Sequence, residues 1–303
     1  MNKRLLTNTS NPDRPSRGRW LLIVLVIHLF LGFGAVALMA FYSRFGTLRI
    51  DPEHNPDNSE ALRYVVGDLG GMPVRIDRRV VHFVEYDGDP GWGERRAGPV
   101  PRRTSSSKLN SFGFYARYPD LGSLSDPEVR EDFERYQSTQ RATNHGAKIK
   151  TTWLDGAVLA GEHYLEHGSL DRFYNNTIGD PDRRGIGRQF ISADSPVDGL
   201  QLFIPRGTDP VTGELWRYVS AGAGDIYIHR NSEGRVSTYI RCGYSHGTRY
   251  YAGCEQNWDM EQHDLSINVS VRYTPDLLPQ WRSIQAKLTD VILGFRDQQS
   301  ANK

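Results

Sequence analysis

Cysteine and strong charge bias are both scarce in this sequence. The chain has two cysteines in 303 residues, and its formal net charge at pH 7 is only +1. A nearly neutral chain does not predict a nucleic acid or another polyanion as partner. No internal repeat is present, and no motif predicts a cofactor. These absences leave a protein of ordinary composition, 38% hydrophobic and 24% charged, long enough for one large domain or two small ones.

Charge is entirely missing from one stretch, Trp20–Tyr42, which contains no Asp, Glu, Lys or Arg. As a helix, this stretch would be about 34 Å long, enough to cross a hydrocarbon core of about 30 Å. Residues 1–19 are basic, which predicts a cytoplasmic N-terminus and an exported C-terminal part. We therefore expect a basic tail over 1–19, one transmembrane helix in the lipid bilayer over 20–42, a polar tether over 43–62, and a folded part over 63–303.

A cleaved signal peptide is the alternative interpretation of the apolar stretch. Ala35-Val36-Ala37 has the small-residue pattern of a cleavage site. The apolar run is longer than the usual signal-peptide core of about 7–15 residues, which favours an anchor.

The two cysteines, Cys242 and Cys254, lie in the part that we expect to be exported. In an oxidising compartment two cysteines twelve positions apart are expected to form a disulfide. Closing so short a loop would stabilise the fold by about 3 kcal/mol in the chain-entropy model. A zinc site made by both cysteines with His246 and His263 is the alternative, but its spacing lacks the paired rhythm of structural zinc sites.

Residue patterns in the exported part predict an α+β fold: an antiparallel sheet with packed helices, one of them a C-terminal amphipathic helix. Strands are expected at 79–86, 112–118, 153–160, 200–204, 225–230, 235–241 and 265–273, and helices at 125–140, 170–175 and 281–295. Strict alternation over 265–273 indicates a strand with one buried and one wet face. The region 63–303 is either one domain or two subdomains divided near residue 195.

One short pattern resembles a catalytic motif. Gly243–Gly247 matches G-x-S-x-G, the turn that carries the nucleophilic serine of many esterases, which would be Ser245. That turn must lie between a strand and a helix, and the following residues do not predict a helix. The only histidine after the motif, His263, also follows too closely for a hydrolase triad. We interpret the stretch as a hairpin-end loop closed by the disulfide, with an envelope esterase using Ser245 as the alternative function.

Two further patterns suggest metal or ion binding and have simpler explanations. His163–His167 reads H-x-x-E-H, but the flanking glycines leave too few residues for the helix that such a zinc motif needs. Glu85, Asp87 and Asp89 lack EF-hand spacing and are typical of a turn. These carboxylates could also be presented to a basic partner. No metal site is predicted.

Aromatic residues make up 11% of the chain, and several lie beside arginine in loop-like stretches. Tyr, Trp and Arg carry much of the binding energy at protein interfaces. We therefore expect the long loop 87–108 and the cysteine-flanked loop to contact a partner. The candidate contact residues are Asp87, Asp89, Trp92, Arg95, Arg96, Tyr244, Arg249 and Tyr250.

Three stretches carry a family resemblance: FVEYDGDPGWGERRAGP with SKLNSFGFYARYPD, and TYIRC with LLPQWRSIQAKLTDVILGF near the C-terminus. They resemble bacterial membrane-anchored proteins that are proposed immunity proteins, encoded beside type VI secretion effectors of the phospholipase kind. The resemblance implies a non-catalytic protein, anchored in the inner membrane with its domain in the periplasm, that binds and occludes a cognate secreted lipase-type toxin. A structural subunit of an envelope complex is the remaining alternative.

Overall fold

The computed structural model describes residues 63–91, 93–122, 124, 126–142, 151–179, 189–219, 224–244 and 251–297. All of them belong to one compact unit, Pro56–Lys303. Within these residues, no helix combines the length and the apolar character needed to cross a membrane. The apolar stretch 20–42, on which the anchor prediction depends, lies outside the described residues.

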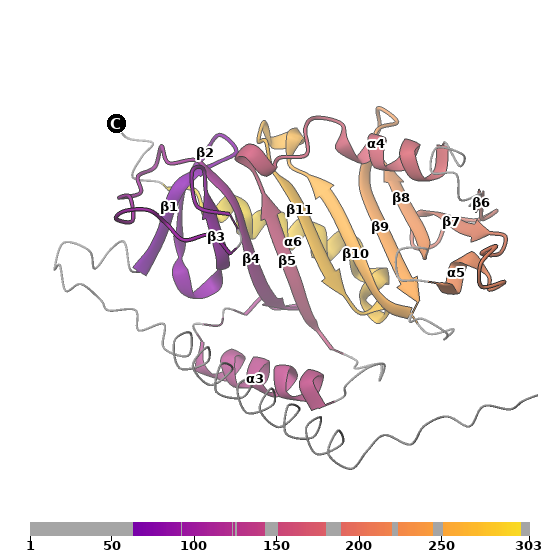
Figure 1. Cartoon of the computed structure of the whole chain (residues 1–303). Coiled ribbons are helices and arrows are strands. Elements are labelled where there is room, and N and C mark those ends of the chain that lie inside the picture. Colours follow the sequence, from indigo (N-terminus) through magenta and orange to yellow (C-terminus); the bar gives the residue numbers. More distant parts are fainter. Residues whose placement is uncertain are drawn as a thin grey trace, which may run out of the picture. The chain divides into compact units, whose positions relative to one another are not determined.

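A nine-stranded antiparallel sheet forms the centre of the fold (Figure 1). Its spatial order is β3 (His82–Tyr86), β4 (Leu109–Arg117), β5 (Trp153–Leu159), β11 (Asn268–Tyr273), β10 (Tyr251–Asp259), β9 (Val236–Tyr244), β8 (Asp225–Arg230), β7 (Gln201–Arg206) and β6 (Gln189–Ser192). Strands from both sides of residue 195 thus pair in one continuous sheet.

One face of the sheet is covered by α6 (Trp281–Gly294), which follows a 3₁₀ segment, Pro275–Gln280. Its buried positions recur at helical spacing and include Ile284, Leu288 and Ile292. They pack in one core with strand residues such as Val158 of β5. Figure 1 shows α6 behind the sheet. The predicted C-terminal amphipathic helix is therefore confirmed.

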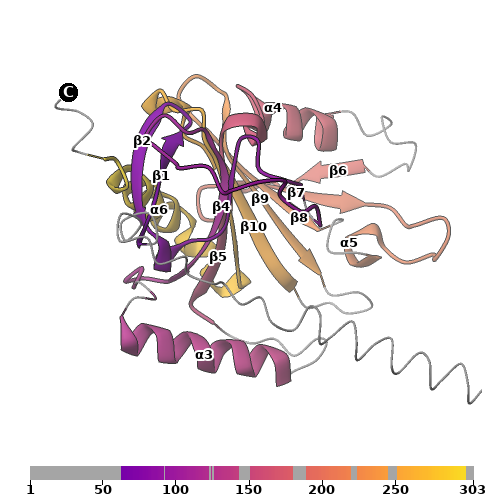
Figure 2. The ribbon, with the colours of Figure 1, turned by 60° about the vertical axis from the view of Figure 1, so that its left-hand side comes forward.

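A separate two-stranded hairpin, β1 (Tyr64–Leu69) and β2 (Met72–Asp77), closes the same core. Both strands alternate between buried and half-buried residues, and their buried side chains join the α6 cluster. The chain after α6 runs beside β2: Arg75 N–H donates to the Phe295 carbonyl at 2.9 Å, and Asp297 N–H donates to the Pro73 carbonyl at 2.9 Å. Figure 2 shows this hairpin beside α6.

Two helices pack on the sheet face opposite α6. Leu170 of α4 (Ser169–Tyr174) joins a cluster with Ile226 of β8 and Tyr239 of β9, whereas the alternate residues of these strands face α6. Near β5, α3 (Pro127–Ala142) packs Phe133 against Trp153, with ring centroids 4.8 Å apart. A short helix, α5 (Trp216–Val219), follows β7.

The architecture confirms the α+β class and the large antiparallel sheet. The expected strand at 79–86 begins later, at His82, because residues 78–80 form a 3₁₀ turn capped by Asp77. The largest correction concerns residues 242–254, which we interpreted as a loop. Most of them are strand, since β9 continues to Tyr244 and β10 begins at Tyr251.

Candidate interaction surface

The predicted disulfide is confirmed: Cys242 and Cys254 are bonded, with an S–S distance of 2.04 Å. They are directly opposite residues of β9 and β10, with Cα atoms 4.0 Å apart, and both are almost completely buried. The bond therefore joins two neighbouring strands inside the core. It does not staple a surface loop, because the strand pattern places both sulfur atoms on the face that α6 covers.

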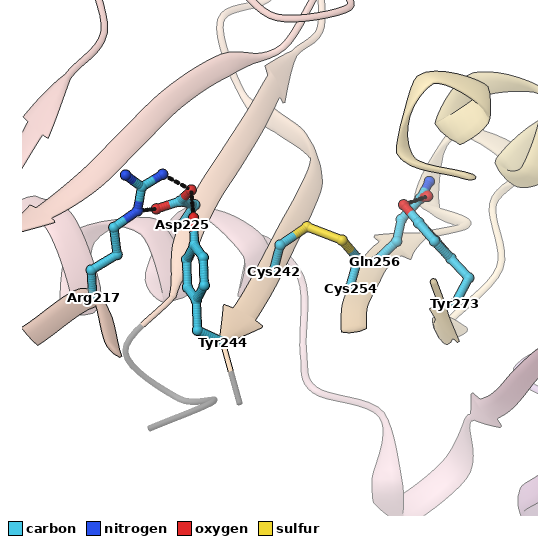
Figure 3. Close-up of a disulfide and its surroundings, with 7 residues drawn as sticks. All are labelled: Arg217, Asp225, Cys242, Tyr244, Cys254, Gln256 and Tyr273. Atoms are coloured by element: carbon cyan, nitrogen blue, oxygen red, sulfur yellow. Dashed lines mark hydrogen bonds and ion pairs between the residues drawn. A yellow bond between two sulfur atoms is a disulfide. The ribbon is translucent and has the colours of Figure 1, made fainter. Parts of the chain in front are cut away.

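A buried carboxylate lies near this disulfide (Figure 3). The side chain of Asp225 is fully buried at the start of β8, and Arg217 of α5 donates to both of its oxygens, with Nε 2.7 Å from Oδ1. The hydroxyl of Tyr244 donates to Oδ2 at 3.3 Å. Tyr244 was a candidate contact residue, but its side chain is only 5% exposed and packs in the core. Its ring is not presented to a partner in this structure.

The strand order around Gly243 also bears on the esterase alternative. Gly243 and Tyr244 end β9, and Tyr251 pairs with Tyr244 at the start of β10. The next described element after β9 is therefore another strand, whereas a nucleophile elbow is followed by a helix. Ser245 itself lies outside the described residues. The zinc alternative fails on chemistry, because both cysteines are in a disulfide and supply no thiolate.

The H-x-x-E-H pattern does not form a single helical face. His163 ends a 3₁₀ turn, Gly161–His163, and its Nε2 lies 3.0 Å from Oε2 of Glu85. His167 precedes α4, and its Nδ1 lies 2.6 Å from Oε2 of Glu261. Each histidine thus pairs with a different carboxylate. Among the residues that the structure describes, no group of three or more His, Cys, Asp or Glu is arranged to hold a metal ion.

Glu261 is the centre of a hydrogen-bonded cluster that attaches the segment before α4 to the end of β10. It accepts hydrogen bonds from the Tyr164 hydroxyl at 2.9 Å and from Gly168 N–H at 3.1 Å, and Arg235 lies 3.7 Å away. Burial, and secondarily the charge of Glu261, raises the pKa of the neighbouring Asp259 carboxyl. Burial also raises the pKa of Tyr164. Each of these groups is bound by another group of the fold, so we assign the cluster the structural role of fixing the segment before α4 to the end of β10.

The loop between β3 and β4 has an ordered base built around Asp89. Its carboxylate accepts a hydrogen bond from Tyr86 N–H at 2.9 Å and binds both Arg96 and Arg103. The guanidinium of Arg103 also stacks over the Tyr86 ring, 4.3 Å from its centroid. We call these four residues the Asp89 clamp. The clamp side chains of Asp89, Arg96 and Arg103 are only 16%, 24% and 20% exposed.

Beyond the clamp, residues 93–102 form the tip of the loop, and nearly all of them are exposed. Val100 is 78% exposed. Arg95 and Arg102 are exposed and make no hydrogen bond or ion pair with any described residue. Of the other candidate contact residues, Asp87 is exposed before the clamp.

The remaining candidate contact residues are either part of the clamp or lie outside the described residues. Asp89 and Arg96 face inward in the clamp and are not offered to a partner as free charges. Trp92, Arg249 and Tyr250 lie outside the described residues.

The middle of the sheet face opposite α6 carries a row of charges that the sequence did not reveal as a group. Strand register places Asp155, Arg272, Glu255 and Arg241 side by side on β5, β11, β10 and β9. Arg241 lies 3.3 Å and Arg272 3.7 Å from Glu255, and the Arg272 side chain is 70% exposed. The alternation of β11 predicted a wet face at Arg272. The sequence patterns did not predict the strand β10, so Glu255 was not placed between Arg272 and Arg241.

Comparison with known proteins gives one similar structure and no family. No protein-family model matches the chain, and no curated protein matches it in sequence. A solved structure of an immunity protein of the Stenotrophomonas maltophilia type IV secretion system is similar, with 17% identity, a TM-score of 0.44, and coverage of 78% of this chain and 94% of that chain. At this identity and TM-score the similarity establishes no common family, and no residue role is transferred from it.

Proposed function

We propose that this protein is an immunity protein: a non-catalytic binder, anchored in the bacterial inner membrane, that occludes a cognate secreted antibacterial effector of the lipase type in the periplasm. The proposal combines the family resemblance of the sequence with the location that the sequence predicts. Its domain would act by stoichiometric binding, so the contact surface matters and no substrate needs to be turned over.

The single observation that most supports the proposed periplasmic location is the buried disulfide between Cys242 and Cys254. Disulfides persist in exported proteins and are rare in the cytosol of most bacteria. The apolar stretch 20–42 after a basic tail supports the same location. Both features are expected of a domain that meets an incoming toxin outside the cytoplasm.

The exposed surfaces support binding as the mode of action. The loop 87–108 extends from the sheet and presents Asp87, Arg95 and Arg102 on an ordered base. We propose that this loop contacts the effector, together with Trp92, Arg249 and Tyr250. Tyr244 is left out of the proposed contact because its hydroxyl and ring are in the core.

A protection assay with a binding assay tests the function. Cells that express the full chain should survive the effector encoded beside its gene, and the purified full chain should bind that effector in a one-to-one complex and stop its lipase activity. A Ser245→Ala variant should protect as well as the wild type, since the proposed action needs no nucleophile. Wild-type chain that neither binds nor protects would remove the proposal, and loss of protection in Ser245→Ala would favour the esterase.

A further inference from the structure

Near the start of the loop between β3 and β4, two of three carboxylates are bound within the structure. The stretch Glu85–Asp89 offers three carboxylates to a basic partner. In the structure Glu85 binds His163 and accepts from Ser111, while Asp89 is shared by two arginines of the clamp. Two of the three carboxylates are therefore used internally, while Asp87 stays exposed together with Arg95 and Arg102.

The region around the loop also contains more basic than acidic residues. Residues 63–108 contain nine Lys and Arg against six Asp and Glu, in a chain whose overall net charge is only +1. Several of these cations are neutralised locally, as Arg79 is by Asp77 and Lys108 by Asp68. Arg95 and Arg102 are not neutralised, and both lie at the loop tip. The tip thus carries Arg95 and Arg102 as exposed cations beside one exposed acid, Glu94, whose carboxylate accepts a hydrogen bond from Gly91 N–H.

The clamp also limits the freedom of the tip. Asp89 is tied to Arg96, which lies within the tip, and to Arg103, which directly follows it, so one carboxylate holds the segment 97–102 at both ends. At the end of the loop Ser107 accepts a hydrogen bond from Asp68 N–H at 2.8 Å. Two prolines, Pro99 and Pro101, flank the exposed Val100 and restrict the backbone further. A loop ordered before binding loses less entropy on binding, which favours a tight complex.

We propose that the tip 93–102 inserts into an acidic cleft of the effector, with Arg95 and Arg102 pairing with carboxylates and Val100 contacting an apolar floor. The inference rests on the proposed function and names the chemistry of the partner surface. Arginine suits this role because its planar guanidinium binds carboxylates through two hydrogen bonds.

A protein cleft fits this tip better than a membrane does. Juxtamembrane segments that bind anionic lipid carry clusters of about four to eight Lys and Arg, whereas the tip offers two unpaired cations separated by an apolar residue. Arginine is also one of the residue types enriched among the anchors of protein interfaces.

Binding of the effector encoded beside the gene to the purified full chain tests the inference. The double variant Arg95→Glu/Arg102→Glu should weaken binding by about 30-fold or more, because each change places a carboxylate against an acidic surface. The matched control is Arg130→Glu/Arg206→Glu, which makes the same charge change at two exposed arginines outside the loop. The control should bind within about 2-fold of the wild type.

Val100→Asp is the third variant and should also weaken binding, and circular dichroism should show that all variants keep the wild-type fold. Wild-type binding with an unaffected tip variant would overturn the inference and leave the proposed function standing. An equal loss in the control would show a general charge effect and also overturn the inference. If wild-type chain does not bind the effector at all, the proposed function fails and the inference fails with it.

A trypsin experiment separates protein from lipid as the occupant. Cleavage after Arg95 and Arg102, followed by mass spectrometry, should slow when the effector is added and stay unchanged with phosphatidylglycerol vesicles. Protection by the vesicles and not by the effector would make the tip a lipid-binding element and overturn the inference.

Discussion

The two segments that the sequence marks as contact loops are built in different ways. The loop 87–108 leaves the sheet, is held at its base by an ion cluster, and exposes its tip. In the segment 242–254, the described residues 242–244 and 251–254 lie in the sheet, are joined by a buried disulfide, and include Tyr244 in the core. Composition was similar in both, since each combines Gly, Arg and aromatic residues.

The difference shows how an aspartate with arginine partners takes on two roles according to its burial. Asp225 is fully buried with Arg217 and Tyr244, where an uncompensated charge would be costly. Asp89 is partly exposed with Arg96 and Arg103, where water screens the interaction. The first cluster supports the fold of the whole domain, and the second fixes the shape of one loop. This comparison leads to three stability predictions.

The largest effect is expected from Asp225→Asn. Removing the charge leaves Arg217 without its bidentate partner beside the core, which should cost about 3–5 kcal/mol. Denaturant unfolding of the full chain would measure the loss as a lower midpoint. Asp87→Asn is the matched control, because that side chain is exposed, and it should unfold within about 0.5 kcal/mol of the wild type. Equal stability of the two variants would mean that the buried pair is not a main support.

Loss of the disulfide should come second. Cys242→Ala/Cys254→Ala should destabilise the domain by about 3 kcal/mol, because the bond shortens the unfolded chain over a twelve-residue separation. Thermal unfolding with and without dithiothreitol would measure it. Reductant should lower the midpoint of the wild type and leave the double variant unchanged. If complete reduction of the bond leaves the wild-type unfolding midpoint unchanged, the prediction is contradicted.

The smallest effect on global stability is expected from Asp89→Asn. The clamp loses its charge-assisted hydrogen bonds at a partly exposed site, for a cost of about 1 kcal/mol. The local effect should be larger: trypsin should cleave after Arg95 and Arg102 several-fold faster than in the wild type. If cleavage at these sites keeps its wild-type rate, the clamp does not order the tip.

Several elements could be predicted because their signals are local. The alternation of 265–273 places Leu265, Ile267 and Val269 in the core, as expected, and α6 buries the residues that its period selects. The strands β4, β5 and β8 also begin and end near their expected positions. Each of these patterns depends on residues within one element, so no knowledge of its neighbours is needed.

Other elements were missed because their partners are remote. The hairpin β1–β2 was not predicted from the sequence, and its outer edge is completed by residues after α6. The strand β10 shows no hydrophobic alternation because the residues that it buries include the polar Gln256 beside Cys254 and Trp258, yet pairing with both β9 and β11 holds it in the sheet. Backbone hydrogen bonds to distant strands here override weak local propensity.

By itself, the sequence determined the class of the fold, the disulfide and the amphipathic C-terminal helix, because these follow from periodicity and from the count of cysteines. Only the tertiary structure decided which charges face solvent. Asp89 and Tyr244 were marked as contact residues from their neighbours in the chain, but a side chain is exposed or buried according to what packs against it. The arginines that bind Asp89 follow it by 7 and 14 residues, and Tyr244 meets Asp225 across the sheet. Contacts between residues this far apart form only when the chain has folded.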